Sequence, residues 1–237
     1  MNAMPTGTCD THMHFYGPPD KYHVVPTSPN KPPLASVADY RQVMEKLSID
    51  RVVVVQPSAY GKDNQCTVDA LKELGSCARG IAVVDTEVSD AELQSLTDVG
   101  IRGVRFHMIP GGVLPWDILE EVAARVHEFG WHVQLQLDGR TLPQYEGLLN
   151  RLPGNMVIDH TGKFFEPVPV EHPGFQSLLR LVDSGRAWVK LSAPYETSKV
   201  GPPSYSDVGV LGKALVAAAP ERMLWATNWP HPSSLDN

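Results

Sequence analysis

The sequence predicts a (β/α)8 barrel from which the last helix is missing. Short apolar runs alternate with longer helical patterns along the chain, there are eight such runs, and polar residues stand at the end of nearly every run. Regular alternation of this kind predicts a parallel sheet with right-handed crossovers. Eight units close into a barrel of about 250 residues, which is close to the 237 residues here. A dinucleotide-binding sheet is the rival, but no GxGxxG follows any expected strand.

Each expected strand is a short apolar or β-branched run. The strands cover residues 8–12, 51–56, 80–85, 103–106, 132–137, 156–159, 187–191 and 223–226. The run RVVVVQ at 51–56 is the clearest, because a nearly continuous apolar run is typical of a strand buried on both faces.

The expected helices are the longer helical patterns that lie between these strands. They cover residues 37–47, 64–74, 90–99, 116–129, 141–150, 173–183 and 206–218. Ser36 and Ser89 are suited to cap the first and third helices, and Gly100 and Gly130 to end the third and fourth. No eighth helical pattern follows residue 226, so we expect one barrel domain over 1–237, truncated at its C-terminus.

The composition of the chain argues against several classes of binding partner. The formal net charge is −7 with no basic stripe, which argues against nucleic acid. Cys9, Cys66 and Cys77 form no CxxC pair, so a reducing cytoplasm is the simplest location. Residues 1–8 lack the pattern of a signal peptide, and no apolar run approaches the ~20 residues of a membrane span. We therefore expect a cytoplasmic protein with no membrane partner, and the oligomeric state stays open.

Active sites in such barrels lie at the carboxyl ends of the strands. The polar residues expected there are His12, His14, Gln56, Ser58, Asp85, Arg105, His107, Gln136, Asp138, His160, Lys163, Lys190, Ser192, Thr227 and Asn228. The period-two spacing of His12 and His14 points both imidazoles to the same side of an extended chain. With His160 from the sixth strand, they can bind a metal or polarise a carbonyl oxygen.

Two cations are suited to bind an anion at this rim. An arginine inside a barrel mouth, such as Arg105, is costly unless an anion satisfies it. We interpret Arg105 as a clamp for a substrate carboxylate and Lys163 as a second cation. A structural ion pair for Arg105 and a solvated position for Lys163 remain as alternatives, and His107 and His231 are more ambiguous.

Several motifs together resemble the lactonase branch of the amidohydrolase-related superfamily, which includes pyrone dicarboxylate lactonases and galactarolactone isomerases. They are DTHMH at 10–14, VVVQPS at 53–58, GVRF at 103–106, DHTGKFF at 159–165, SAPYETS at 192–198 and ERMLWATNWPHP at 221–232. The resemblance implies that His12, His14 and His160 surround a lactone carbonyl oxygen, with Asn228 at the position of the hydrolytic aspartate. It implies substrate contacts for Tyr22, Ser58, Arg105 and Ser233, and we expect Gln136, Asp138 and Lys163 at the rim to contact the substrate as well.

Departures from the pyrone lactonases bear on the substrate. The amide of Asn228 cannot take a proton, residues 110–112 replace a second arginine, and Gln136 replaces a tyrosine. These changes argue against pyrone dicarboxylate itself. An isomerase moves an acyl group between hydroxyls of one molecule and need not activate water, which suits Asn228. Isomerases nevertheless lack the first histidine of HxH, which this chain keeps as His12. Asp138 or a histidine is the candidate base.

We therefore expect hydrolysis of the ester bond of a carboxylate-bearing lactone, of the sugar-acid or pyrone type. Intramolecular acyl migration is the close alternative. A metal-dependent decarboxylase of the same superfamily and a non-catalytic ligand-binding barrel remain open. We expect no cofactor, because the places of further metal ligands hold Arg105, Gln134 or Gln136, and Asn228. If a divalent metal binds, His12, His14 and His160 are its expected ligands.

Overall fold

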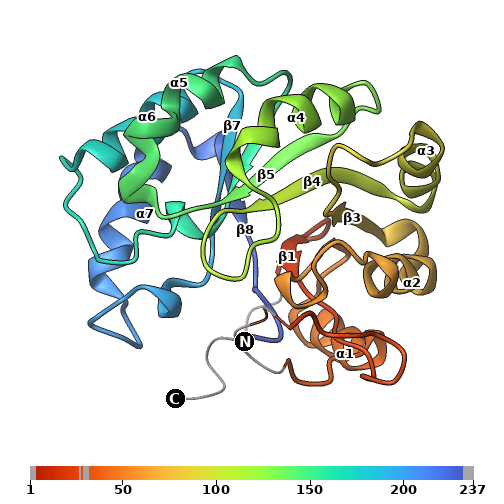
Figure 1. Cartoon of the computed structure of the whole chain (residues 1–237). Coiled ribbons are helices and arrows are strands. Elements are labelled where there is room, and N and C mark those ends of the chain that lie inside the picture. Colours follow the sequence, from red (N-terminus) through yellow and green to blue (C-terminus); the bar gives the residue numbers. More distant parts are fainter. Residues whose placement is uncertain (1–3, 27, 29–31, 232–237) are drawn as a thin grey trace.

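A computed structural model of the chain describes residues 4–26, 28 and 32–231. Eight parallel strands pair in sequence order, as the alternating pattern predicts (Figure 1). They are β1 Cys9–Met13, β2 Arg51–Val55, β3 Ala78–Ala82, β4 Ile101–His107, β5 His132–Gln136, β6 Met156–Ile158, β7 Ala187–Leu191 and β8 Met223–Trp225. The arrangement confirms the (β/α)8 barrel.

Strand β3 departs most from expectation, since it begins and ends earlier than the predicted 80–85. The backbone N–H of Val83 donates to Asn64 Oδ1, and its carbonyl accepts from Asn64 Nδ2, both at 2.8 Å. Because the Asn64 amide takes both backbone groups of Val83, the ladder with β2 ends before it.

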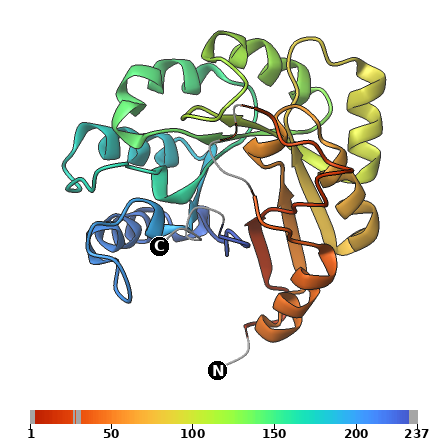
Figure 2. The same cartoon turned by 60° about the horizontal axis from the view of Figure 1, so that its bottom comes forward.

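The helices cover the outside of the strands (Figures 1 and 2). They are α1 Val37–Leu47, α2 Gln65–Leu74, α3 Asp90–Val99, α4 Leu119–His127, α5 Leu142–Arg151, α6 Pro173–Asp183 and α7 Ser206–Ala218. Ser36 and Ser89 cap α1 and α3 as predicted, and Gly100 ends α3 in the left-handed region. No helix follows β8 within the described residues. Of the helices that the structure describes, none is long and apolar enough to cross a membrane.

The two faces of the strands differ in chemistry. On β5, Val133 and Leu135 are buried in the apolar core, while the alternating Gln134 and Gln136 are buried among polar groups. Successive side chains of a strand point to opposite faces. The barrel interior is therefore polar toward its carboxyl end, and this polarity creates the site.

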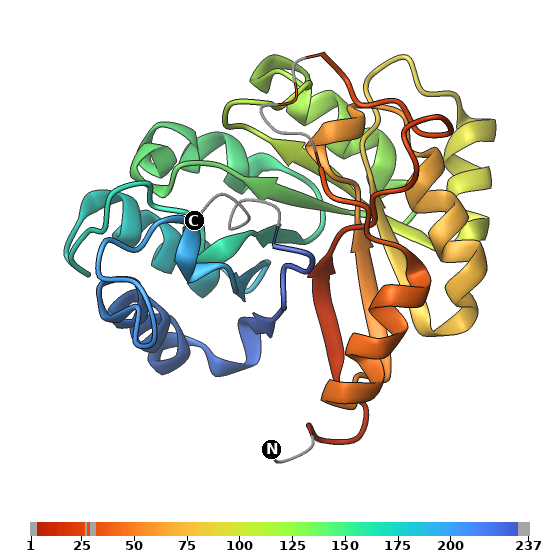
Figure 3. The ribbon, with the colours of Figure 1, turned by 90° about the horizontal axis from the view of Figure 1, so that it is seen from below.

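The first and last strands form no backbone ladder in the described part of the chain, and individual hydrogen bonds nearly close the barrel between them. Thr11 Oγ1 donates to the carbonyl of Trp225 over 2.8 Å, and the backbone N–H of Asn228 donates to the carbonyl of His12 over 2.9 Å. Figure 3 shows β1, in red, beside the blue segment that follows β8. Closure carries Asn228 to the end of β1, beside the histidines.

Asp10 anchors this closure from inside. Its buried carboxylate accepts from the Tyr40 hydroxyl of α1 over 2.7 Å and from the Thr227 backbone N–H over 3.0 Å. It also accepts from the Thr227 hydroxyl and from the backbone N–H of His12. One side chain therefore joins β1, α1 and the segment after β8.

We expect Asp10→Ala to lower the free energy of unfolding by about 3 kcal/mol, because it leaves several buried donors without an acceptor. Urea unfolding followed by circular dichroism measures the change. Tyr40→Phe is the control, since it removes one donor and should cost about 1 kcal/mol. Equal losses in the two variants would contradict the anchoring role.

Candidate active site

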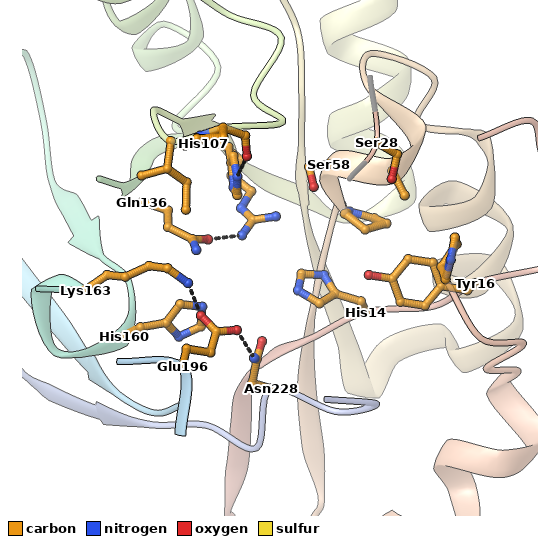
Figure 4. A pocket seen from close by; sticks show the side chains of 16 residues that line it. His14, Tyr16, Ser28, Ser58, His107, Gln136, His160, Lys163, Glu196 and Asn228 are labelled. Carbon is orange, nitrogen blue, oxygen red and sulfur yellow. Dashed lines mark hydrogen bonds and ion pairs between the residues drawn. The ribbon is translucent and has the colours of Figure 1, made fainter. Parts of the chain in front are cut away.

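A cavity of about 200 Å³ opens at the carboxyl end of the strands. Figure 4 shows His14 and Tyr16 on one side and His160, Lys163 and Glu196 on the other. The predicted site residues that line it are His14, Ser58, Arg105, Gln136, His160, Lys163 and Asn228. Segments far apart in the sequence thus supply one polar pocket.

Two predicted substrate contacts lie outside the lining of this cavity. The Tyr22 hydroxyl donates to Asp69 Oδ2 of α2 over 2.8 Å, and Tyr22 is absent from the lining. Asp138 accepts from the backbone of Arg140 and pairs with its guanidinium at 2.6 Å, also outside the lining. Because it is paired with Arg140 and outside the lining, Asp138 is poorly placed to act as the catalytic base. Ser233 lies outside the described residues.

The HxH pair is held by a chain of hydrogen bonds. His14 Nδ1 lies 2.8 Å from the Val55 carbonyl, so Nδ1 carries the hydrogen and Nε2 is an acceptor. His12 Nε2 lies 3.2 Å from His14 Nε2, and Lys190 Nζ lies 3.2 Å from His12 Nδ1. Burial holds the pKa of both histidines well below the ordinary value, which makes them neutral. With Lys190 donating, His12 in turn donates to His14.

His160 is the imidazole best placed to donate into the cavity. Its Nδ1 lies 2.9 Å from Ser192 Oγ, and with the hydroxyl donating, Nε2 carries the hydrogen. Burial, together with His12, keeps the pKa of His160 well below the ordinary value. His160 and Lys163 both adopt left-handed backbone conformations, at φ of 54° and 42°. Such conformations are costly for residues other than glycine and cluster at functional sites.

A buried ionic cluster lies beneath the cavity. The fully buried Asp159 accepts from Gln134 Nε2 over 3.1 Å and lies 3.5 Å from Lys190 Nζ. Its Oδ1 lies 3.3 Å from His12 Nδ1. Burial disfavours its ionisation, but the neighbouring Lys190 ammonium favours the carboxylate, and the pKa of Asp159 is held well below the ordinary value.

Arg105 faces both this cluster and the cavity. Its Nη1 donates to the Gln56 carbonyl over 2.9 Å, its Nη2 donates to Gln136 Oε1, and Nη2 lies 3.7 Å from Asp159 Oδ2. Its buried Nε has no hydrogen-bond partner among the described residues. The contact with Asp159 is the structural ion pair that remained as an alternative for Arg105. It leaves the Nε–H of Arg105 for another acceptor.

Lys163, Glu196 and Asn228 form a second polar group. Lys163 pairs with Glu196 Oε2, and Asn228 Nδ2 donates to Glu196 Oε1 over 3.3 Å and to the Tyr195 hydroxyl over 2.8 Å. The buried Asn228 Oδ1 has no partner in the described part of the chain. Burial and the Arg105 cation lower the pKa of Lys163 to about 8, and the Asp159 carboxylate opposes them.

The residues at hand do not fit a divalent metal well. His12, Asp159 and His160 place possible ligand atoms within 4.8 Å of one another. However, Lys190 Nζ lies 3.2 Å from His12 Nδ1 and 3.5 Å from Asp159 Oδ1. An ammonium beside two of the three ligands repels another cation. Asp159 already neutralises the cluster, so no anionic ligand is left over in this group.

Nothing in the sequence indicated a role for three side chains that lie in or beneath the cavity. Tyr16 lines the cavity, and it continues the period-two series of His12 and His14, a signal that could have found it. Lys190 appeared at the rim without a role, yet it contacts the HxH pair. Glu196 lies in a turn after β7, Pro194–Glu196, and no periodicity marks it.

Comparison with known proteins decides the family, because the amidohydrolase family model matches residues 9–236. The chain belongs to the amidohydrolase family. This result confirms the superfamily resemblance seen in the motifs.

Named relatives of this amidohydrolase cover nearly its whole length. It is 37% identical to a D-galactarolactone isomerase of Agrobacterium fabrum, over 98% of this chain and 79% of the relative. It is 36% identical to a 2-pyrone-4,6-dicarboxylate hydrolase of Comamonas testosteroni, over 99% and 80%. A crystal structure of an Agrobacterium tumefaciens protein, without ligand, is 37% identical with a TM-score of 0.91, over 98% of this chain and 84% of that one.

We expect two lysines of this amidohydrolase, Lys163 and Lys190, to titrate near pH 8. Burial lowers the pKa of each to about 8, so each is a cation below that pH and neutral above it. Carbon NMR of lysine labelled at Cε measures both midpoints, and Lys163→Met and Lys190→Met assign them. The exposed Lys62, whose pKa Asp85 raises, is the internal control. Ordinary midpoints of about 10.4 for both would contradict the prediction.

Proposed function

We propose that this amidohydrolase acts on the ester bond of a carboxylate-bearing lactone, by hydrolysis. The observation that carries the proposal is Arg105, whose buried Nε has no partner among the described residues and whose side chain lines a cavity shared with His160. A buried guanidinium N–H without an acceptor is costly. A substrate carboxylate would supply that acceptor and place the ester beside the imidazole.

The reaction follows from the groups that line the cavity. Attack on a lactone carbonyl builds negative charge on its oxygen. A donor aimed at that oxygen, such as His160 Nε2–H, supplies about 3 kcal/mol of transition-state stabilisation. Arg105 and Lys163 hold the substrate carboxylate, so the lactone carbonyl is held close to the groups that react with it. The relatives named for a lactone isomerase and a pyrone hydrolase support ester chemistry of this kind.

Two orphan acceptors favour a hydroxylated substrate. Among the described residues, His107 Nδ1 and Asn228 Oδ1 are buried without partners, and both residues line the cavity. Burial lowers the pKa of His107 to about 3, so its ring is neutral and Nδ1 can accept. Hydroxyl groups of a sugar-acid lactone would donate to both atoms, whereas a pyrone dicarboxylate ring carries no hydroxyl donor.

Acyl migration is the second candidate, and Asn228 favours it. An amide at that position cannot take a proton from water. In a migration, the substrate's own hydroxyl attacks the carbonyl, and the ring changes size without hydrolysis. The same carboxylate clamp and the same imidazole serve both reactions, so only the attacking oxygen differs.

We expect proton NMR to show turnover of aldarolactones and none of pyrone dicarboxylate. The acyclic acid as product indicates hydrolysis, and an isomeric lactone indicates migration. Release of carbon dioxide from a carboxylated substrate would instead identify a decarboxylase. No change with any lactone, despite ligand binding, would leave a non-catalytic barrel and sink the proposal.

Arg105→Met accompanies this assay as the test of the carboxylate clamp. Loss of a charge-assisted hydrogen bond of about 1.5–3 kcal/mol should raise KM by about tenfold to a hundredfold. Arg102→Met is the matched control on β4, because Arg102 donates to the backbone of Thr97 and Ile101. An equal effect of both substitutions would contradict the clamp.

We further propose that turnover needs no metal, because Lys190 already neutralises Asp159 beside the histidines. Purified protein should contain well under one equivalent of divalent metal, and prolonged chelation should leave kcat unchanged. Metal analysis by plasma mass spectrometry, before and after chelation, makes the measurement. Stoichiometric zinc whose removal abolishes turnover and whose return restores it would refute this proposal.

A further inference from the structure

Ester opening requires an acceptor for the proton of the attacking hydroxyl, and the cavity offers few. Glu196 is the one carboxylate among the described residues that line it. Its side chain is 9% exposed, so it is shielded from bulk water while still reaching the cavity. A carboxylate in this position can serve as a general base.

The other candidates are poorly suited to take the proton. Asn228 is an amide, and His14 Nε2 already faces His12 Nε2 at 3.2 Å. Burial keeps the pKa of His160 well below the ordinary value, which makes it a weak base. Its Nε2 also carries a hydrogen, so His160 donates into the cavity and does not accept a proton there. Asp138 is paired with Arg140 outside the lining, and Asp159 lies fully buried beneath the histidines.

Both oxygens of Glu196 are positioned by specific donors. Lys163 holds Oε2, and Asn228 Nδ2 approaches Oε1 at 3.3 Å. Asn228 is itself fixed, because its backbone N–H donates to the His12 carbonyl over 2.9 Å and its Nδ2 also donates to Tyr195. A carboxylate oxygen can accept more than one hydrogen bond, so each donor orients Glu196 without using its capacity to accept a proton.

We propose that Glu196 is the general base of the lactone reaction and that Asn228 positions it; the inference rests on the function proposed above. As the attacking oxygen bonds to the carbonyl carbon, its proton passes to Glu196 and the carbonyl π pair moves to oxygen. When the tetrahedral species collapses, that pair re-forms the carbonyl and the ring C–O bond breaks. The leaving oxygen then takes the proton back from Glu196. The carboxylate is regenerated, and no co-reactant beyond water or the substrate's hydroxyl is needed.

Glu196→Gln tests the proposal in the full-length protein with the aldarolactone that wild type turns over best. We expect kcat to fall by at least about 100-fold, KM to change little, and the acidic limb of the kcat–pH profile to disappear. Glu196→Asp, which keeps a carboxylate, should recover part of kcat. Glu166→Gln is the matched control, because Glu166 is an exposed carboxylate paired with Lys199 at 3.3 Å.

A merely structural role, in which Glu196 only neutralises Lys163, makes a different prediction. Glu196→Gln would then alter KM and leave kcat and its acidic limb in place. The double variant Lys163→Met with Glu196→Gln removes both members of the ion pair, so it retains no unpaired buried charge and separates misfolding from loss of the base. We expect it to show lower kcat than Lys163→Met alone.

The outcomes separate this proposal from the function on which it rests. If wild type turns over a lactone and Glu196→Gln keeps half of its kcat, the base assignment falls and lactone chemistry stands. The base assignment also falls if the double variant matches Lys163→Met. If wild type turns over no lactone, both proposals fail together.

Discussion

The arrangement of polar side chains inside the barrel depends on the contacts of one buried carboxylate, that of Asp159. It lies at the end of β6 and meets one side chain from each of four other strands. These side chains are His12 of β1, Arg105 of β4, Gln134 of β5 and Lys190 of β7. A buried carboxylate is tolerated only when cations and donors compensate it. The compensation fixes where the cations lie, and with them the floor of the cavity.

The charges around this floor do not cancel. Arg105, Lys163 and Lys190 are three cations, whereas Asp159 and Glu196 are two carboxylates. An acidic chain of net charge −7 therefore carries a locally positive cavity. Low-dielectric walls strengthen the attraction of such a cavity for an anion. The same excess of positive charge disfavours a divalent metal, so one feature supports both the proposed carboxylate clamp and the proposed metal independence.

The proposed base and the residue that positions it come from different loops of the barrel. The amide of Asn228, after β8, cannot accept a proton, whereas Glu196, after β7, places a carboxylate oxygen 3.3 Å from that amide. Loops at the carboxyl ends of the strands vary without disturbing the barrel. A catalytic group can therefore be supplied from a neighbouring loop while the rest of the site keeps its place.

The sequence by itself determined the order of strands and helices, the caps at Ser36 and Ser89, and the shared face of His12 and His14. Backbone sterics and contacts between near neighbours control these features, so local patterns reveal them. Only the tertiary structure decided that Asp138 lies outside the cavity lining and that Glu196 enters it. These placements depend on how loops fold across the barrel, and Glu196 meets a residue 33 positions away. No periodicity encodes an encounter of that kind.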